Sequence, residues 1–181
     1  MNLSSKPGRW AALLLILTCP PLHAADFSIG QFLINVPARF QGPVTTKSDA
    51  QVLAYSFSVP GSASGLQAVI QETDVRGSNL SNAELIDISR RYLAKMLQAV
   101  ERRRSDFRKS EPATIKLAGS PASEVTWTGR TNGVMNNGRL FCVANGSDIL
   151  FLHVMGAGAV PDADMSAAIK AIQSMRRLSS K

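Results

Sequence analysis

Residues 139–155 decide the fold of this chain, and they read RLFCVANGSDILFLHVM. Two apolar runs, Arg139–Ala144 and Ile149–Met155, flank the turn-forming residues Asn145–Asp148. Both runs are apolar at consecutive positions, which is typical of strands that are covered on both faces. We therefore expect a hairpin at the centre of a sheet, with a helix on each side.

Shorter strands are expected around this hairpin. Residues 27–36 predict one strand, or two short strands around Gly30, and residues 51–59 alternate apolar with small side chains. The remaining segments are expected as follows: strands over 66–75, 113–118 and 122–128, a loop over 37–49, and tight turns at Asn132-Gly133 and Asn137-Gly138.

Two amphipathic helices complete the pattern. Ser81 and Glu84 form a capping box, and an apolar stripe at steps of three and four follows as far as about Arg103. Asp162 is expected to cap the second helix, with Arg176-Arg177 at its C-terminal end. The elements together predict an α+β fold: a single-domain αβα sandwich with a largely antiparallel central sheet and two main helices.

Several short motifs resemble the PsbP-like superfamily, whose bacterial periplasmic members include DcrB-like proteins. The resemblance implies an αβα sandwich and an accessory or binding role without catalysis, and it transfers no functional residue. The resemblance depends on the capped helix and on four short motifs. These motifs are Phe32-x-Ile34-x-Val36-Pro37, Gly119–Glu124 followed by Trp127-Thr128-Gly129, Gly138–Phe141, and Ile149–Phe151.

The first 25 residues resemble a secretory signal peptide. Lys6 and Arg9 precede the apolar run WAALLLIL at residues 10–17, and Ala24 ends a plausible cleavage motif. We expect cleavage near Ala24 or Ala25, a single domain over residues 26–181, and a periplasmic or secreted protein. Lipid anchoring at Cys19 is the alternative, although Thr18 and Pro20 fit that motif poorly.

Cleavage and export would change the net charge, the available partners and the number of thiols. Residues 1–25 contain two of the 20 basic residues and none of the 13 acidic ones, which leaves a formal charge of +5 on residues 26–181. Outside the cytoplasm, a basic surface favours anionic headgroups or an acidic protein over nucleic acid. No transmembrane segment is expected after residue 25. Cys142 is then the only thiol, so no internal disulfide can form.

One pair of side chains could support chemistry. A two-residue loop at Gly146-Ser147 would place Cys142 and His153 diagonally on one face of the hairpin, about 7–8 Å apart. A Cys–His nucleophile requires hydrogen-bond distance, so a buried thiol and a buried imidazole are the favoured interpretation. A copper(I) site that includes Met155, and a hydrolase that uses Glu72 and Asp74, are the remaining alternatives.

A basic cluster is the best candidate for binding. It faces few acidic residues and predicts an anion- or partner-binding surface near the end of the first helix. A solvated helix face that complements the helix dipole is the alternative interpretation. The cluster comprises Arg90, Arg91, Lys95, Arg102, Arg103, Arg104, Arg108 and Lys109.

The sequence thus predicts an exported, non-enzymatic accessory or binding protein that contacts a protein partner or an anionic envelope surface. We expect no cofactor and no resident metal. A carrier of a small apolar or lipid-like ligand, held between the sheet and a helix, is the second hypothesis.

Overall fold

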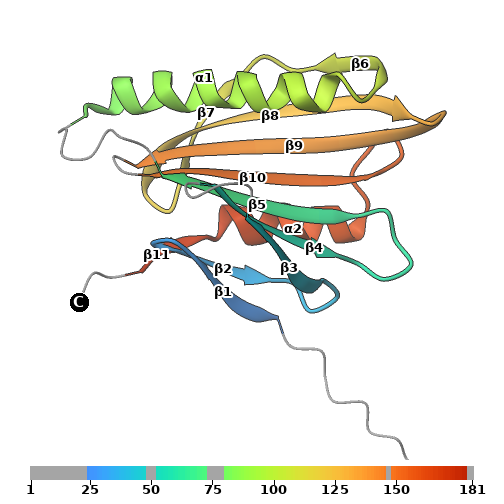
Figure 1. Ribbon diagram of the computed structural model, residues 1–181, viewed down its shortest axis with the longest axis horizontal. Helices are drawn as coiled ribbons and strands as arrows, with labels where there is room; N and C mark the ends of the chain where they lie inside the picture. Colours follow the sequence, from blue (N-terminus) through green and yellow to red (C-terminus); the bar gives the residue numbers. More distant parts are fainter. Residues whose placement is uncertain (1–23, 48–51, 73–79, 146–147, 179–181) are drawn as a thin grey trace, which may run out of the picture.

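An eight-stranded sheet lies between two helices, and a three-stranded sheet lies beside the second helix (Figure 1). The computed structural model describes residues 24–47, 52–72, 80–145 and 148–178. The predicted α+β fold and αβα layering are confirmed. Most of the predicted signal peptide, residues 1–23, lies outside the described residues.

The large sheet is antiparallel, in the order β3-β4-β5-β10-β9-β8-β6, with β7 also paired to β8. The predicted central hairpin is β9–β10, and its register places Cys142 opposite Phe151 and His153 opposite Leu140. The strands are β3 (Gln41–Lys47), β4 (Val52–Ser58), β5 (Gly65–Glu72), β6 (Ser105–Lys109), β7 (Ala113–Leu117), β8 (Ser120–Thr131), β9 (Val134–Asn145) and β10 (Asp148–Ala157).

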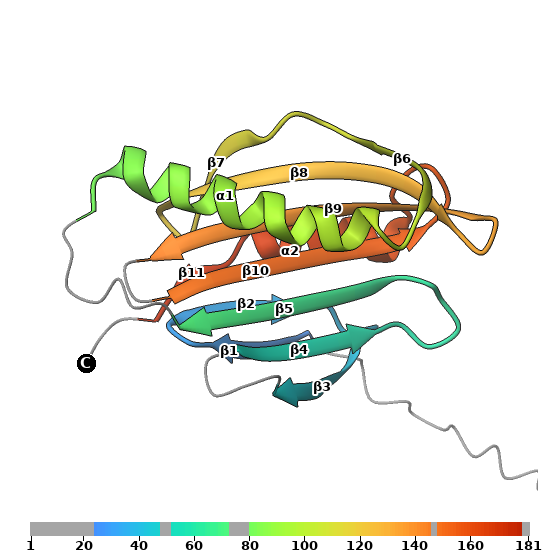
Figure 2. The same cartoon turned by 45° about the horizontal axis from the view of Figure 1, so that its top comes forward.

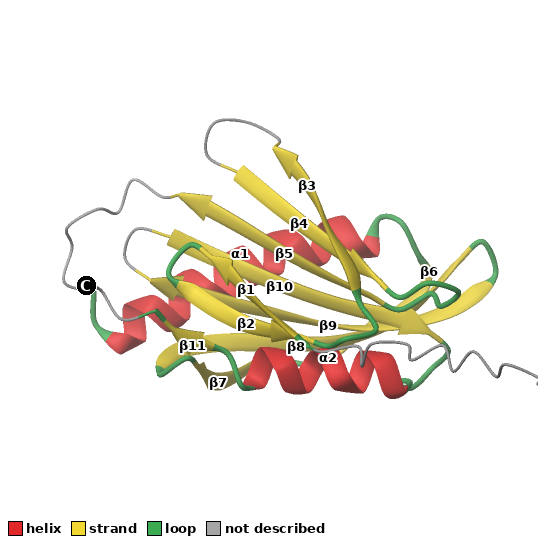
Figure 3. Ribbon diagram, turned by 90° about the horizontal axis from the view of Figure 1, so that it is seen from below, coloured by secondary structure: helices red, strands yellow, loops and turns green. Residues whose placement is uncertain are grey.

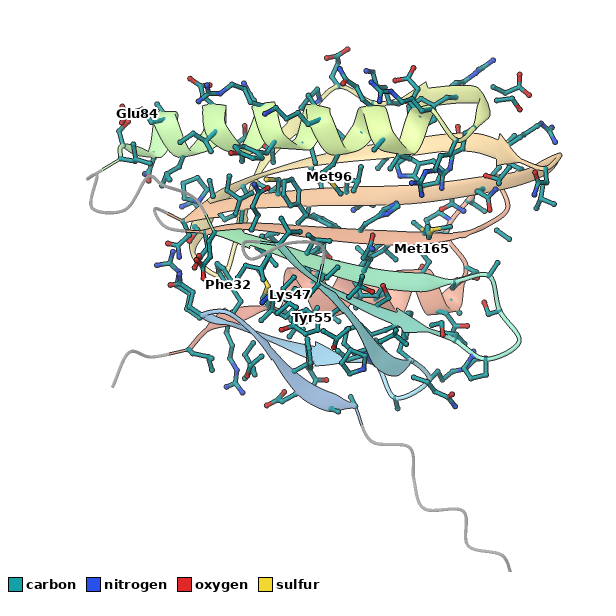
Figure 4. All side chains as sticks on the ribbon, viewed as in Figure 1. Phe32, Lys47, Tyr55, Glu84, Met96 and Met165 are labelled. Carbon is teal, nitrogen blue, oxygen red and sulfur yellow. The ribbon has the colours of Figure 1, made fainter. Side chains whose placement is uncertain are left out.

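Helix α1 (Asn82–Glu101) covers one face of this sheet (Figures 1 and 2). Leu93 and Leu97 pack with Val125, Trp127 and other buried side chains of β8, β9 and β10. Figure 4 shows Met96 on the side of α1 that faces the sheet. The helix ends two residues before the predicted end at Arg103.

The predicted capping box at the start of α1 is present. The backbone N–H of Glu84 donates to Ser81 Oγ at 3.3 Å, and the Ser81 N–H donates to Glu84 Oε2 at 2.8 Å. These bonds hold the pKa of Glu84 below its usual range, through the Ser81 backbone first and the Ser81 hydroxyl second.

Replacing Ser81 with alanine is expected to lower the free energy of unfolding by about 1 kcal/mol, because the N3 amide loses its acceptor. Urea unfolding followed by circular dichroism measures the change. Ser81→Thr keeps the acceptor and serves as the matched control. Equal losses in the two variants would contradict the capping role.

Helix α2 (Ala163–Gln173) covers the opposite face and packs against β10, β5 and β2 (Figure 3). The side chain of Asp162 accepts from the Met165 N–H at 2.7 Å and caps the helix as predicted. Beside α2, the small sheet consists of β1 (Ala25–Ile29), β2 (Phe32–Val36) and β11 (Arg176–Arg177), in the order β1-β2-β11. Residues 27–36 therefore form two strands.

At the edges of the large sheet, one prediction is wrong and one strand was not predicted. Residues 37–49 were expected to form a loop, but Gln41–Lys47 form the edge strand β3, because the β-branched residues Val44, Thr45 and Thr46 pair with β4. No element was predicted between α1 and residue 113, and this segment contains strand β6. Its charged sequence and the register shift after Ser105 hide the strand pattern.

Two further predictions fail near the ends of elements. Arg176-Arg177 do not end α2, which stops at Gln173, but pair with β2. Asn137-Gly138 lie inside β9 and form no turn. Asn132-Gly133, in contrast, form the predicted turn, with positive φ angles of 51° and 78°.

Candidate functional site

The eight cations of the basic cluster separate into two exposed groups and one half-buried residue. Arg90, Arg91 and Lys95 lie on the body of α1. Arg104 lies under the helix end. The remaining four flank the connection from α1 to β6 (Figure 2), with two after the end of α1 and two at the end of β6, and we call them the basic tip: Arg102, Arg103, Arg108 and Lys109.

The basic tip carries uncompensated charge. All four side chains are exposed, and none forms a hydrogen bond or an ion pair with another residue in the described parts of the chain. Of the nearby acids, Asp106 is engaged by Arg130, whose Nε lies 3.3 Å from Asp106 Oδ2. Four neighbouring cations without partners create a positive potential that attracts anions.

The cations on the body of α1 are partly engaged. Arg90 Nη2 donates to Thr114 Oγ1 at 3.0 Å, and Lys95 Nζ lies 5.0 Å from the centroid of the Tyr92 ring. Arg91 and Lys95 border a groove of about 270 Å³ between α1 and the β9–β10 hairpin. Apolar side chains line much of this groove: Leu80, Leu85, Ile88, Tyr92, Ala144 and Ile149.

Arg104 does not belong to the exposed surface. Its guanidinium carbon lies 4.2 Å from the centroid of the Trp127 ring, and Nη1 donates to the Val100 carbonyl oxygen at 2.7 Å. Burial first, and the charge of Arg103 second, lower the pKa of Arg104. Arg104 therefore supports the packing below the helix end. This difference could not be predicted from the sequence, since residues 102–104 are all arginine.

Trp127 is the centre of that packing. Besides Arg104, it stacks on Phe107 at 6.0 Å and contacts His153 at 5.7 Å between ring centroids. Gly138 lies opposite Trp127 in the neighbouring strand, and a Cβ at Gly138 would lie 2.3 Å from the indole ring. The indole ring therefore packs directly on the backbone of β9, and any side chain at position 138 would clash with it.

The buried groups here have unmet hydrogen-bonding capacity. Among the described residues, Arg104 Nε, Trp127 Nε1 and His153 Nε2 are buried without a partner. Burial, and secondarily the charge of Arg104, lower the pKa of His153 to about 4. His153 is therefore neutral at physiological pH.

Cys142 and His153 do not form a nucleophilic pair. The observed register makes them diagonal neighbours on adjacent strands, about 7–8 Å apart. Burial raises the pKa of the Cys142 thiol, so the thiol stays protonated, while the imidazole is a weak base. Attack by a thiolate requires the opposite environment.

The other alternative chemistries gain no geometric support. Within the described ranges, no group of three or more His, Cys, Asp or Glu side chains could hold a metal ion. The hydrolase hypothesis required Glu72 and Asp74. Glu72 is exposed at the end of β5, and Asp74 lies outside the described residues.

Comparisons with known proteins support the fold. No protein-family model and no curated protein matches this sequence. The solution structure of cyanobacterial PsbP (CyanoP) from Synechocystis is similar over 88% of this chain and 95% of its own, with a TM-score of 0.63 and 11% identity.

Two crystal structures are also similar. LpqN, involved in cell envelope biogenesis of Mycobacterium tuberculosis, has a TM-score of 0.54 at 12% identity, with 86% of each chain covered. A protein from Bacteroides thetaiotaomicron has a TM-score of 0.54 at 10% identity over 87% of this chain. The present chain spans 49% of the length of that protein. Together with the layered architecture described above, these similarities establish that the chain has a PsbP-like fold.

Proposed function

We propose that this chain is an exported, non-enzymatic accessory protein that uses its basic tip to dock on an anionic surface of the cell envelope. One observation carries the proposal: Arg102, Arg103, Arg108 and Lys109 are neighbouring, exposed and without partners in the described structure. The exposed Arg130, in contrast, is engaged by Asp106.

The folded environment supports a binding role over a catalytic one. The buried thiol and imidazole are held in the protonation states that disfavour catalysis. A similar fold occurs in a protein involved in cell envelope biogenesis. None of the helices in the described ranges is long and apolar enough to cross a membrane.

Vesicle co-sedimentation tests the proposal. The purified protein is expected to sediment with vesicles of phosphatidylglycerol and phosphatidylcholine and to be released by high salt, since salt screens exposed charges. Each cation near an anionic lipid surface contributes about 1 kcal/mol, so the double variant Arg102→Gln/Arg103→Gln should partition roughly 30-fold more weakly.

The double variant Lys47→Gln/Lys170→Gln is the matched control. It removes the same charge from exposed positions on β3 and α2, away from the tip. Equal loss of vesicle binding in both double variants would show that only net charge matters. Absence of salt-sensitive binding to any anionic vesicle would leave an acidic protein as the remaining partner and overturn the lipid-surface proposal.

The second candidate function is transport of a lipid-like ligand, and the groove beside α1 favours it. Apolar side chains line that groove, and Arg91 and Lys95 stand at its border, which suits an acyl chain next to an anionic headgroup. The same vesicle experiment separates the two functions. A carrier moves labelled lipid into the supernatant, whereas a docking protein leaves the lipid in the pellet.

A further inference from the structure

A second concave region lies on the sheet face opposite α1. Helix α2 packs against β10, β5 and β2, and it leaves the far end of β6, β8 and β9 open. We call this region of about 290 Å³ the strand groove, and its volume lies at the small end of the range for ligand pockets. Its lining includes Arg108, Thr126, Thr128, Asn137, Arg139 and Met165.

Strand register determines which side chains line the strand groove. Arg108 pairs with Thr128, and Thr128 pairs with Asn137, so these three residues form one row across β6, β8 and β9. Thr126 pairs with Arg139 in the next row on the same face. From strand spacing and rise, the Cα atoms of Arg108 and Arg139 lie about 12 Å apart. Two long side chains at that separation can reach one small group between them.

The electrostatics favour an anion. Arg108 forms no hydrogen bond or ion pair within the described ranges, and Arg139 has only a loose contact of 3.7 Å with Glu124 Oε2. Asp106 lies beside Arg108 but is engaged by Arg130 Nε at 3.3 Å. Asp162, before α2, is engaged by Ser64 Oγ at 2.6 Å and by the Met165 N–H at 2.7 Å. Two guanidinium groups therefore face the strand groove against one partly available carboxylate.

Asn137 gives the strand groove a buried polar atom without a partner. Asn137 Nδ2 donates to the carbonyl oxygens of Gly158 and Val160 at 3.1 and 2.9 Å, which fixes the loop before α2. Asn137 Oδ1 has no partner among the described residues and can accept a hydrogen bond from a ligand hydroxyl group. Buried polar atoms without partners are rare in folded proteins and often mark the place of a bound ion or water.

We propose that the strand groove binds a small organic oxyanion, with a carboxylate or phosphate group between Arg108 and Arg139. Guanidinium groups recognise both oxyanions through paired, charge-assisted hydrogen bonds. Thr126 and Thr128 supply hydroxyl groups at the floor. Pro161 and Met165 form an apolar wall that suits a short carbon chain. The site shares Arg108 with the basic tip and differs from it in requiring Arg139, Thr126 and Thr128.

Nuclear magnetic resonance titration of the purified protein tests this assignment. Glycerol 3-phosphate and glutarate are the probes, so that the phosphate and carboxylate arms are measured separately. Either probe is expected to shift the amide signals of Thr126, Thr128 and Arg139 at concentrations up to about 10 mM, which covers weak sites. Arg108→Gln and Arg139→Gln should each weaken binding about tenfold, because each removes a charge-assisted hydrogen bond.

Lys47→Gln is the control, because it removes one charge far from the strand groove. No shift at the three amides with either probe would overturn the proposal, as would equal weakening by Lys47→Gln. The amide spectrum of each variant reports directly whether it is folded. Arg102→Gln/Arg103→Gln should bind the probes normally even if it loses vesicle binding, so this site and the docking function fail or succeed separately.

Discussion

Replacing Trp127 with alanine is expected to lower the free energy of unfolding by about 4 kcal/mol, as is typical of large buried aromatic side chains. Trp127 is 2% exposed and contacts Phe107, Arg104 and His153. Its removal leaves a cavity below the end of α1 and exposes the Arg104 guanidinium. Urea unfolding followed by circular dichroism measures the loss.

Gly138 tests whether the indole is held against the strand as the structure shows. Gly138→Ala places a Cβ 2.3 Å from the ring of a Trp127 that is enclosed on its other sides, and the variant should lose about 3 kcal/mol from overpacking. In a Trp127→Ala background the same methyl group meets no ring. The cost of Gly138→Ala should therefore fall close to zero, which is strong coupling between the two positions.

Gly65→Ala is the matched control for this cycle. Gly65 also lies in a strand of the large sheet, but its added Cβ would meet the Phe57 carbonyl oxygen at an ordinary contact distance of 3.4 Å. We expect little loss of stability there. Additive effects of Trp127→Ala and Gly138→Ala would contradict the contact between the ring and the strand.

Mild acid is expected to destabilise the protein through His153. The folded state keeps the His153 pKa at about 4, mainly through burial, whereas an unfolded histidine has a pKa of about 6.5. Between these values the unfolded chain takes up a proton that the folded chain does not. Stability is therefore complete above about pH 6.5 and falls as the pH drops towards 4, by about 3 kcal/mol in total.

Unfolding at two pH values measures this effect. Between pH 7.5 and pH 5 the free energy of unfolding should fall by about 2 kcal/mol. His153→Phe should remove most of that dependence, because the only other histidine is His23 in the predicted signal peptide. A dependence that persists in His153→Phe would assign the acid sensitivity to another group. Glu84 and Asp162 have lowered pKa values and act at lower pH, where carboxylates become protonated.

The sequence predicted the elements whose structure is determined by residues close together in the chain. The capping box at Ser81, the alternation of Val125 with Trp127, and the doubly apolar hairpin are each determined by neighbouring residues. Edge strands were missed because their pairing partners, rather than their own composition, make them strands. Strand β6 is an example, since three of its five residues are charged.

The candidate sites were less predictable. The sequence identified the basic cluster, but it could not show that Arg104 stacks on Trp127 while its neighbours remain free. The strand groove was missed because Asn137-Gly138 has the composition of a turn. Gly138 instead provides space for the indole ring. The polar alternation of Thr126 and Thr128 was the available signal for the open face.

The small sheet joins distant parts of the chain. Strand β11 pairs with β2, and Arg176 donates to Asp26 across a separation of 150 residues. Phe32, Ile34 and Val36 of β2 are core residues beneath α2, so that core is enclosed by early and late segments together. Contacts of such long range are slow to form, on a scale of milliseconds to seconds. The apolar side of β2 therefore stays uncovered until α2 packs on it, and the edge of β2 stays unpaired until β11 arrives, so completing this half of the fold requires the chain as far as Arg177.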